Sequence, residues 1–199
     1  MPAWTTLAQF LKSDLKHLVV FGDIKSEYFS HHFIFSWCGG KVYTQDDYVY
    51  MCDSCGQSYY DNPKPCVEIV LFNDSEQVLL SKRAVEPYKG KFDLPGGFVD
   101  KGETLEEAIV REVNEEIGID VERLQDLRYV SSYKAFYPWG KEIVHNVIAE
   151  FTATVSNGIQ VKGMDDVELV EWVDMEDLNK YDYSIPEVPM MIKLALGRG

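Results

Sequence analysis

Residues 104–118 carry the strongest structural signal in the sequence, because they hold both ends of a helix and an apolar stripe along it. Thr104 can cap the first turn while Glu107, three residues later, reciprocates, which is the pattern of a capping box. Gly118 is the residue type favoured just past a helix end. We therefore predict an amphipathic helix that packs on a sheet through apolar side chains at four-residue steps, namely Leu105, Ile109, Val113 and Ile117.

The other side of this helix carries glutamates at spacings that bring them together. Glu112, Glu115 and Glu116 lie three and four positions apart and therefore share a face. Like charges at such spacings destabilise an isolated helix, but bound Mg²⁺ or Mn²⁺ would reverse this effect, because hard cations prefer carboxylate oxygens. A solvated acidic face is the alternative. The nearby Gly-Gly pair at 96–97 can offer backbone carbonyls and Arg111 can pair with carboxylates, so a cation site is favoured.

The charge balance limits the partners that the chain can have. A formal net charge of −14, from 33 acidic and 19 basic side chains, repels a nucleic-acid backbone. We therefore expect a small anionic substrate that is bound through cations, and no nucleic-acid partner. No segment approaches the roughly 18 consecutive apolar residues of a membrane span, and the first twenty residues lack a clean apolar secretion core. We expect a cytoplasmic protein without a membrane partner.

Three parts follow one another along the chain. Residues 1–34 begin with an amphipathic helical pattern, and the sequence does not indicate what this segment does. Residues 35–62 are rich in Gly, Asp, Tyr and Cys and predict a small knuckle-and-hairpin module. Pro63 and Pro65 then interrupt regular structure, so we predict a compact domain over residues 63–199.

Strand and helix patterns alternate within this larger part. Strands surrounded by two or three helices suggest a mixed sheet in an α/β sandwich. We predict strands at 67–72, 78–82, 92–94, 126–137, 143–155 and 169–173, a Gly-rich bend at 95–97, and further helices near 175–178 and 188–196.

The helix belongs to a longer pattern, G-x5-E-x7-R-E-U-x-E-E-x-G-U. Every defining position is filled, by Gly97, Glu103, Arg111, Glu112, Glu115, Glu116 and Gly118 with aliphatic Val113 and Ile119. Seven specified residues would coincide by chance at a given start point with a probability on the order of 10⁻⁸. The chain therefore resembles the Nudix hydrolases over roughly residues 63–196. The resemblance implies an α/β/α sandwich with a mixed sheet, preceded here by a small zinc-ribbon-like module.

This resemblance also implies an activity and roles for residues. The activity is metal-dependent hydrolysis of a phosphoanhydride bond in a nucleoside diphosphate linked to another group, such as NADH, ADP-ribose or a related dinucleotide. Glu103 with Arg111 would orient the site, and the general base in this family often lies on a later loop, where Asp166 and Glu168 are candidates. Either could instead cap or solvate the turn before residue 169. The implied ligands of Mg²⁺ or Mn²⁺ are Glu112, Glu115, Glu116 and the Gly97 carbonyl.

The cysteine-rich segment resembles the zinc ribbon that precedes the catalytic domain in some Nudix enzymes, including NADH pyrophosphatases. Cys38, Cys52 and Cys55 match three ligands, but Phe35 stands where a fourth cysteine would be expected, and structural zinc normally takes four ligands. The fourth could be His31, His32 or Cys66. We favour His32, because Cys66 begins a predicted core strand. A degenerate ribbon with thiols buried as small hydrophobes is the alternative.

A run of aromatic residues follows the box where substrate-recognition segments often fall in this family. Their rings could stack an adenine or nicotinamide ring, or they could instead form core or dimer contacts, and the latter would fit a homodimer. The sequence does not separate NADH from ADP-ribose. The run comprises Tyr129, Tyr133, Phe136, Tyr137 and Trp139, of which all but Tyr129 are candidate substrate contacts.

Two other classes of function compete with hydrolysis. A catalytically silent Nudix-like ligand-binding or regulatory module would be expected to have a damaged box and a basic helix-turn-helix partner, and the sequence shows neither. A purely structural module built on the ribbon would leave the glutamates of the helix unexplained. Hydrolysis therefore remains the preferred hypothesis.

Overall fold

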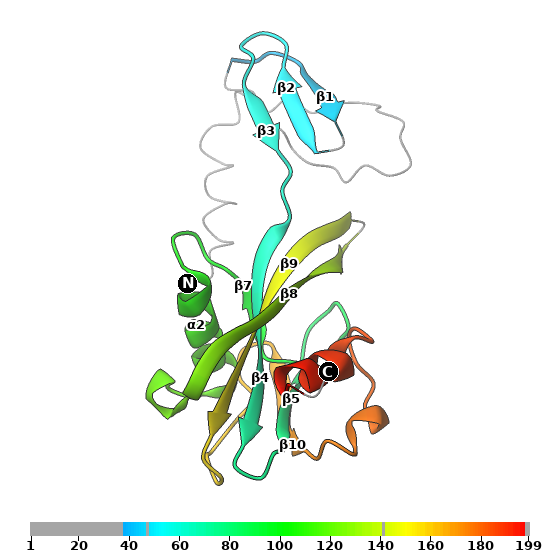
Figure 1. The fold of residues 1–199 in the computed structure, drawn as a ribbon. Coiled ribbons are helices and arrows are strands. Elements are labelled where there is room, and N and C mark those ends of the chain that lie inside the picture. The colour runs from blue at the N-terminus through cyan, green and yellow to red at the C-terminus, as the bar shows by residue number, and fades with distance from the viewer. Residues whose placement is uncertain (1–37, 47, 141, 198–199) are drawn as a thin grey trace. The chain divides into compact units, whose positions relative to one another are not determined.

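The computed structural model describes residues 38–46, 48–140 and 142–197, which divide into two compact units (Figure 1). The smaller unit contains residues up to Asn62 together with Gly140 and Glu142, and the larger one contains Pro63–Trp139 and Ile143–Gly199. The predicted helix within residues 1–34 and the candidate zinc ligands His31 and His32 lie outside the described residues. No helix among the described residues is long and apolar enough to cross a bilayer.

The smaller unit is an antiparallel sheet of three strands, β1 (Val42–Asp46), β2 (Val49–Cys52) and β3 (Ser58–Tyr60). A tight turn joins β2 to β3, in which Gly56 N donates to Cys52 O at 3.0 Å. Gly56 has a φ of 71°, a left-handed conformation that glycine adopts without steric cost. The turn folds the chain back on itself and brings Cys55 close to Cys52.

The larger unit is built on a mixed sheet with the strand order β10-β5-β4-β9-β8. Its central pair, β4 (Lys64–Asn73) and β9 (Glu142–Val155), is parallel, whereas β5 (Val78–Arg83) and β10 (Val167–Val173) pair antiparallel to each other. The short strands β6 (Phe92–Asp93) and β7 (Gly96–Phe98) pair with β5 and β4 respectively, and the outer strand is β8 (Gln125–Trp139). The predicted mixed sheet is confirmed.

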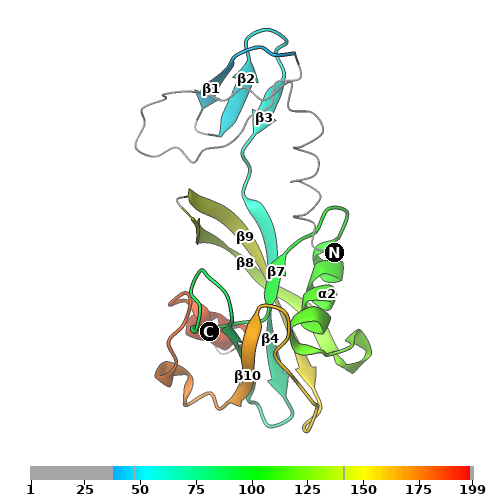
Figure 2. The same cartoon turned by 180° about the vertical axis from the view of Figure 1, so that it is seen from behind.

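Strand β4 contributes to a hydrophobic core on each face of this sheet. Val67, Ile69 and Leu71 pack in the core that contains the buried side of α2 (Leu105–Ile117), while Val70 and Phe72 pack with α3 (Val188–Ala195). Successive side chains of a strand point to opposite faces, so one strand can hold both helices. Figures 1 and 2 show α2 and α3 on opposite faces of the sheet. The predicted α/β/α sandwich is therefore confirmed.

Helix α2 begins and ends as the sequence predicts. The Thr104 side chain accepts from Glu107 N, and the Glu107 side chain accepts from Thr104 N at 2.8 Å, so the capping box is confirmed. Gly118 ends the helix with a φ of 70°. The apolar stripe is only partly as predicted, because Leu105 is 37% exposed and Ala108 is buried in its place, whereas the rest is fully buried, namely Ile109, Val113 and Ile117.

The bend predicted at 95–97 is confirmed only at Pro95, because residues 96–98 form strand β7 and pair with β4. A Cβ on Gly96 would lie 2.2 Å from Val67 O, and the φ of Gly96 is 152°. Only glycine permits such a close approach of two backbones. The glycine pair thus presses β7 against the central strand and beside helix α2.

The prediction of a helix near residues 175–178 is wrong for most of that range. Residues 175–177 form a turn, and a short 3₁₀ helix, η3 (Leu178–Lys180), begins at residue 178. Backbone bonds from Asp177 N to Asp174 O and from Lys180 N to Asp177 O, both 2.9 Å long, join residues three apart, as in 3₁₀ geometry. The other 3₁₀ helix is η2 (Val121–Arg123).

Candidate active site

Arg111 is the centre of an ion-pair network on α2. Its guanidinium donates to both carboxylate oxygens of Glu103, at 2.7 and 2.9 Å, which is the paired geometry that makes such bonds strong. It also donates to Glu112 Oε1 at 2.8 Å and to Glu115 Oε2 at 3.1 Å. Arg111 lowers the pKa of Glu103 below its usual range. The network thus holds three carboxylates around the Arg111 guanidinium.

The three glutamates of the box divide into two groups. Glu112 and Glu115 share the Arg111 guanidinium, whereas Glu116 turns toward strand β7 and accepts from Gly96 N at 2.9 Å. Glu112 also reaches β7, because a Cβ on Gly97 would lie 2.5 Å from its Oε1 atom. The missing side chain at Gly97 therefore leaves room for the Glu112 carboxylate beside the backbone. Two carboxylates and the glycine backbone form a cradle that the pattern on the helix alone does not reveal.

Glu116 and Asp166 place two carboxylic acids next to each other, the first buried and the second half-buried. Glu116 is 6% exposed, and its pKa lies well above the usual range, because burial and the neighbouring Asp166 charge both disfavour the ionised form. The pKa of Glu112 is raised as well, mainly by burial. A divalent cation would reverse both effects, since it favours the ionised carboxylates. These oxygen donors suit Mg²⁺ or Mn²⁺.

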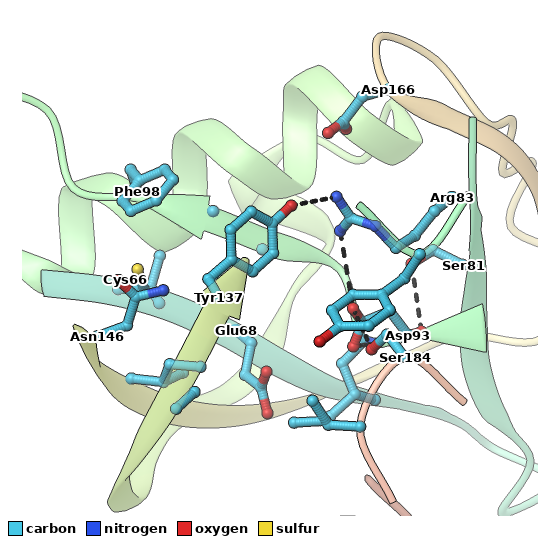
Figure 3. A pocket seen from close by; sticks show the side chains of 18 of the residues that line it. Cys66, Glu68, Ser81, Arg83, Asp93, Phe98, Tyr137, Asn146, Asp166 and Ser184 are labelled. Carbon is cyan, nitrogen blue, oxygen red and sulfur yellow. Dashed lines mark hydrogen bonds and ion pairs between the residues drawn. The ribbon is translucent and has the colours of Figure 1, made fainter. Parts of the chain in front are cut away.

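A cavity of about 150 Å³ opens beside this cradle (Figure 3). Gly97, Glu116 and Asp166 line one part of it, and so do the predicted aromatic contacts Phe136 and Tyr137. A cavity of roughly this volume can hold a ring the size of benzene. The fold therefore places a small-molecule site directly against the acidic cradle.

Arg83 is a functional candidate that the sequence reasoning missed. It lies at the end of β5, lines the cavity, and donates to the Tyr137 hydroxyl at 2.5 Å (Figure 3). Its NH1 atom lies 3.7 Å from Asp93 Oδ2, an ion pair in which both side chains are largely buried. A guanidinium suits phosphate oxygens. No motif marks this arginine, because a single basic residue at a strand end is common.

Two acids in the cavity wall, of which Glu68 is buried and Asp93 largely buried, were also missed. Glu68 on β4 is 6% exposed and Asp93 on β6 accepts from Ser184 Oγ at 2.7 Å. Burial raises the pKa of Glu68 to about 8, with further repulsion from Asp93 and Glu150. The sequence did contain an indication for Glu68, because this residue interrupts the otherwise apolar run of a central strand, as Glu150 does in another central strand. A lone charge in such a run indicates a special environment.

The raised pKa of Glu68 predicts a change of stability with pH. The folded state keeps a proton that the unfolded chain releases above the ordinary value of 4.5, so the free energy of unfolding falls as pH rises toward about 8. Glu68→Gln removes this loss. We expect urea unfolding of the metal-free proteins to give similar free energies of unfolding for the wild type and Glu68→Gln at about pH 4. As the pH rises to about 8, the variant should become increasingly more stable than the wild type. An advantage independent of pH would contradict the raised pKa.

The two candidates for the general base occupy different places. Asp166 lines the cavity beside Glu116, and its backbone is fixed by a bond from Ala84 N to Asp166 O of 2.7 Å. Glu168 lies inside strand β10, where its half-exposed carboxylate pairs with Lys82 Nζ at 3.5 Å. Glu168 is not among the residues that line the cavity. The geometry therefore favours Asp166.

The predicted aromatic contacts also differ from one another. Tyr137 lines the cavity and packs edge to face on Phe98, with ring centroids 6.5 Å apart. Phe136 lines the cavity too but is 52% exposed, and Tyr129 is equally exposed. Tyr133 buries its hydroxyl beside Glu68, outside the cavity lining. The side chain of Trp139 lies outside the described part of the structure.

Three cysteines meet in the smaller unit. The Sγ atoms of Cys38, Cys52 and Cys55 all lie within 4.8 Å of one another, and Cys38 Sγ is 3.4 Å from Cys52 Sγ. Cys66, an alternative fourth ligand, belongs instead to the larger unit, where it lines the cavity and burial raises its pKa to about 12. Among the residues described here, the thiol cluster therefore has three members.

Comparison with known proteins extends the likeness beyond the box. The NUDIX domain family model matches residues 62–193. The NAD-capped RNA hydrolase NudC of Citrobacter koseri is 33% identical over 156 residues, which are 77% of this chain and 56% of that protein. The chain thus spans about half the length of the curated relatives it matches.

Solved structures show the same architecture. The NUDIX hydrolase from Nitrosomonas europaea superposes with a TM-score of 0.60 at 27% identity, covering 79% of this chain and 86% of the other. The NUDIX domain of Shewanella oneidensis NrtR, solved with ADP ribose, has a TM-score of 0.58 at 23% identity and covers 70% of this chain and 90% of the other. At this identity, the likeness shows only that the two chains share a fold. Because the family model covers well over half of its length, and Glu112 and Glu116 of the box lie against β7 in this fold, the chain belongs to the Nudix hydrolase family.

Proposed function

We propose that the protein hydrolyses a phosphoanhydride bond in a nucleoside diphosphate linked to another group, such as NADH, ADP-ribose or a related dinucleotide. The observation that carries this proposal is the meeting of Asp166 with Glu116, whose ionised form is disfavoured by burial, at the edge of a cavity large enough for a ring. Such an arrangement is costly unless cations and a phosphate group are to be bound there.

The residues of the cradle fit Mg²⁺ or Mn²⁺. The oxygen donors beside β7 would be Glu112, Glu116 and the Gly97 carbonyl. Glu115 would add a further carboxylate on the solvent side. When bound, these cations neutralise charge on the phosphoryl oxygens and lower the pKa of a coordinated water. Arg111 and Glu103 would hold Glu112 and Glu115 in place, and Arg83, which lines the same cavity, would contact the phosphates.

The proposed chemistry is one displacement at phosphorus. A water oxygen forms a bond to one phosphorus while the bond from that phosphorus to the bridging oxygen breaks. Asp166 would accept the proton of the attacking water, since it lies in the cavity, whereas Glu168 pairs with Lys82. The products are two phosphate monoesters.

One experiment tests this function. The pure protein is incubated with Mg²⁺ or Mn²⁺ and NADH, NAD⁺, ADP-ribose, FAD, diadenosine polyphosphates or nucleoside triphosphates, and the products are identified by mass. We expect hydrolysis of at least one dinucleotide, which stops with chelator, and heavy oxygen from labelled water in one of the products. Binding of ADP-ribose without turnover at any metal concentration would instead support a catalytically silent ligand-binding module.

The name of the Citrobacter relative adds RNA with a 5′ NAD cap to this panel. The net charge of −14 disfavours a polyanion, so we expect free NAD⁺ to be preferred to the capped RNA. A preference for the capped RNA would show that the prediction of no nucleic-acid partner is wrong. The cytoplasmic location and the homodimer also stay predictions.

We further propose that the smaller unit binds one structural zinc ion through Cys38, Cys52 and Cys55. Thiolates around tetrahedral zinc lie roughly 3.8 Å apart, given zinc–sulfur bonds of about 2.3 Å, and the three sulfur atoms lie within 4.8 Å of one another. The buried hydrophobic residues described in this unit are only Tyr50 and Cys52. So small a core usually requires a metal or a disulfide for stability.

Zinc content provides the test of this second proposal. We expect elemental analysis to find about one zinc per chain in the wild type and clearly less in Cys55→Ser, because a site with fewer thiolates binds zinc weakly. Cys66→Ser is the matched control, since Cys66 belongs to the larger unit, and it should retain the metal. Equal zinc content in Cys55→Ser and the wild type, or its absence from both, would refute the zinc site.

A further inference from the structure

The cavity wall contains buried oxygen atoms that have no hydrogen-bond partner. Glu68 Oε1 and Asn146 Oδ1 are both fully buried and unpaired, and both residues line the cavity. Their side chains are 6% and 5% exposed. Leaving a buried acceptor unsatisfied costs about 1–3 kcal/mol. Two such atoms in one cavity wall therefore indicate a ligand that supplies hydrogen-bond donors.

The packing around Glu68 shows why the protein itself does not satisfy this acceptor. The Tyr133 hydroxyl lies close to the Glu68 carboxylate, but it has no partner in hydrogen-bond geometry. Glu150 is the direct neighbour of Glu68 across the parallel β4–β9 pair, and its Oε2 accepts from Ser131 Oγ at 2.8 Å. Glu150 Oε1 and the Tyr133 hydroxyl are themselves buried without a hydrogen-bond partner, so neither neighbour satisfies Glu68 Oε1.

The position of the two acceptors relative to the cradle decides which part of a substrate can reach them. In Figure 3, Asp166 and Arg83 lie on one side of Tyr137, and Glu68 and Asn146 lie on the other. Phosphates held at the cradle and Arg83 would leave the organic end of the substrate near Tyr137 and Phe98, whose rings can stack on it. A ring-sized group fits a cavity of about 150 Å³.

We propose that Glu68 and Asn146 determine substrate specificity by accepting hydrogen bonds from an amino or carboxamide group on a heteroaromatic ring of the substrate. A ring that carries a carboxylate or an oxo group at the same place would leave Glu68 Oε1 and Asn146 Oδ1 without a donor, and its binding would be weaker. This inference rests on the proposed function, because it identifies the part of that substrate that enters the cavity. The adenine amino group and the nicotinamide carboxamide share this chemistry.

Two substrate pairs distinguish these sources. NAD⁺ and nicotinic acid adenine dinucleotide differ only in the carboxamide, and NAD⁺ and nicotinamide hypoxanthine dinucleotide differ only in the adenine amino group. We expect the wild type to prefer NAD⁺ in one pair by about ten- to hundredfold in kcat/KM, the loss that follows when buried polar groups stay unpaired. The pair that shows the preference identifies the ring.

Variants connect this preference to the two residues. Glu68→Met and Asn146→Leu keep the volume of the side chain and remove the acceptor, so the preference should fall to within about threefold of unity. Glu68→Gln retains an acceptor oxygen and should retain most of the preference. Glu150→Met is the matched control, because Glu150 is fully buried next to Glu68 but does not line the cavity, and it should leave the preference unchanged.

Binding measurements separate this inference from the proposed function. Dissociation constants of the same pairs, measured by calorimetry with chelator present, report recognition without turnover. Absence of hydrolysis with Mg²⁺ or Mn²⁺ would overturn the function, while a preference in binding that Glu68→Met removes would still support the specificity role. Equal binding and equal kcat/KM within both pairs in the wild type, or equal effects of Glu68→Met and Glu150→Met, would overturn the specificity role.

Discussion

Glu116→Gln is expected to lower kcat of the metal-dependent reaction by at least about 10³-fold, equivalent to about 4 kcal/mol. Glu116 is the most buried of the box glutamates, and its carboxylate lies between Gly96 N and Asp166. Glutamine has the same shape and can still accept from Gly96 N, so the fold should persist. What it loses is the negative charge that offsets a cation. Steady-state kinetics with saturating Mg²⁺ measure the effect.

Thermal unfolding separates catalysis from folding in this experiment. Because burial and Asp166 disfavour the ionised form of Glu116, we expect the metal-free variant to be at least as stable as the wild type near neutral pH. Glu106→Gln is the matched control, since Glu106 lies exposed in the first turn of the same helix. Turnover of Glu116→Gln within about tenfold of the wild type would remove the central support for the proposed metal site.

Arg111→Met is expected to lower both stability and activity. The guanidinium makes two bonds to Glu103 and single bonds to Glu112, Glu115 and the Phe98 carbonyl. Without it, the largely buried Glu112 charge loses its cation and faces Glu115. We expect a loss of about 2–3 kcal/mol in the free energy of unfolding, and a fall of about 10²-fold in kcat, because the displaced carboxylates no longer hold their positions.

Urea unfolding and kinetics measured on the same samples check this result. Arg111→Lys retains a positive charge but not the planar fork, so we expect it to recover part of the stability and little of the activity. Arg123→Met is the control, since Arg123 is exposed on a short 3₁₀ helix, and it should change neither quantity. Full activity in Arg111→Lys would show that charge alone suffices and that the paired geometry has no positioning role.

Local patterns were enough to predict most of the fold. The capping box of Thr104 and Glu107, the end of α2 at Gly118 and the long strands β8 and β9 depend on neighbours in sequence, and these features are confirmed. Two local patterns misled. The Gly-Gly pair suggested a bend, although Gly96 instead permits β7 to press against Val67, a residue of a distant segment. The apolar residues near 175–178 suggested a helix, although the short-range bonds there form a turn and a 3₁₀ helix.

The candidate site shows the same division between local and distant information. The box residues could be named from their spacing, and the contacts of Arg111 with Glu103, Glu112 and Glu115 follow from positions on one helix and the segment before it. Arg83, Asn146 and Asp93 could not be named, because each becomes part of the cavity only when β5, β9 and β6 are assembled around β4. Spacing also left Asp166 and Glu168 equivalent, although only Asp166 lines the cavity.

The amino-acid sequence by itself determined the family, the helix with its glutamates, and the mixed sheet, because capping, periodicity and motif spacing act over a few residues. The tertiary structure alone decided where the charges point. It turned Glu116 toward β7 and Asp166, assigned Glu112 and Glu115 to Arg111, and placed Glu68 unpaired in the cavity wall. The physical reason is that burial and the pKa of an acid depend on segments far apart in the chain, which meet only after folding.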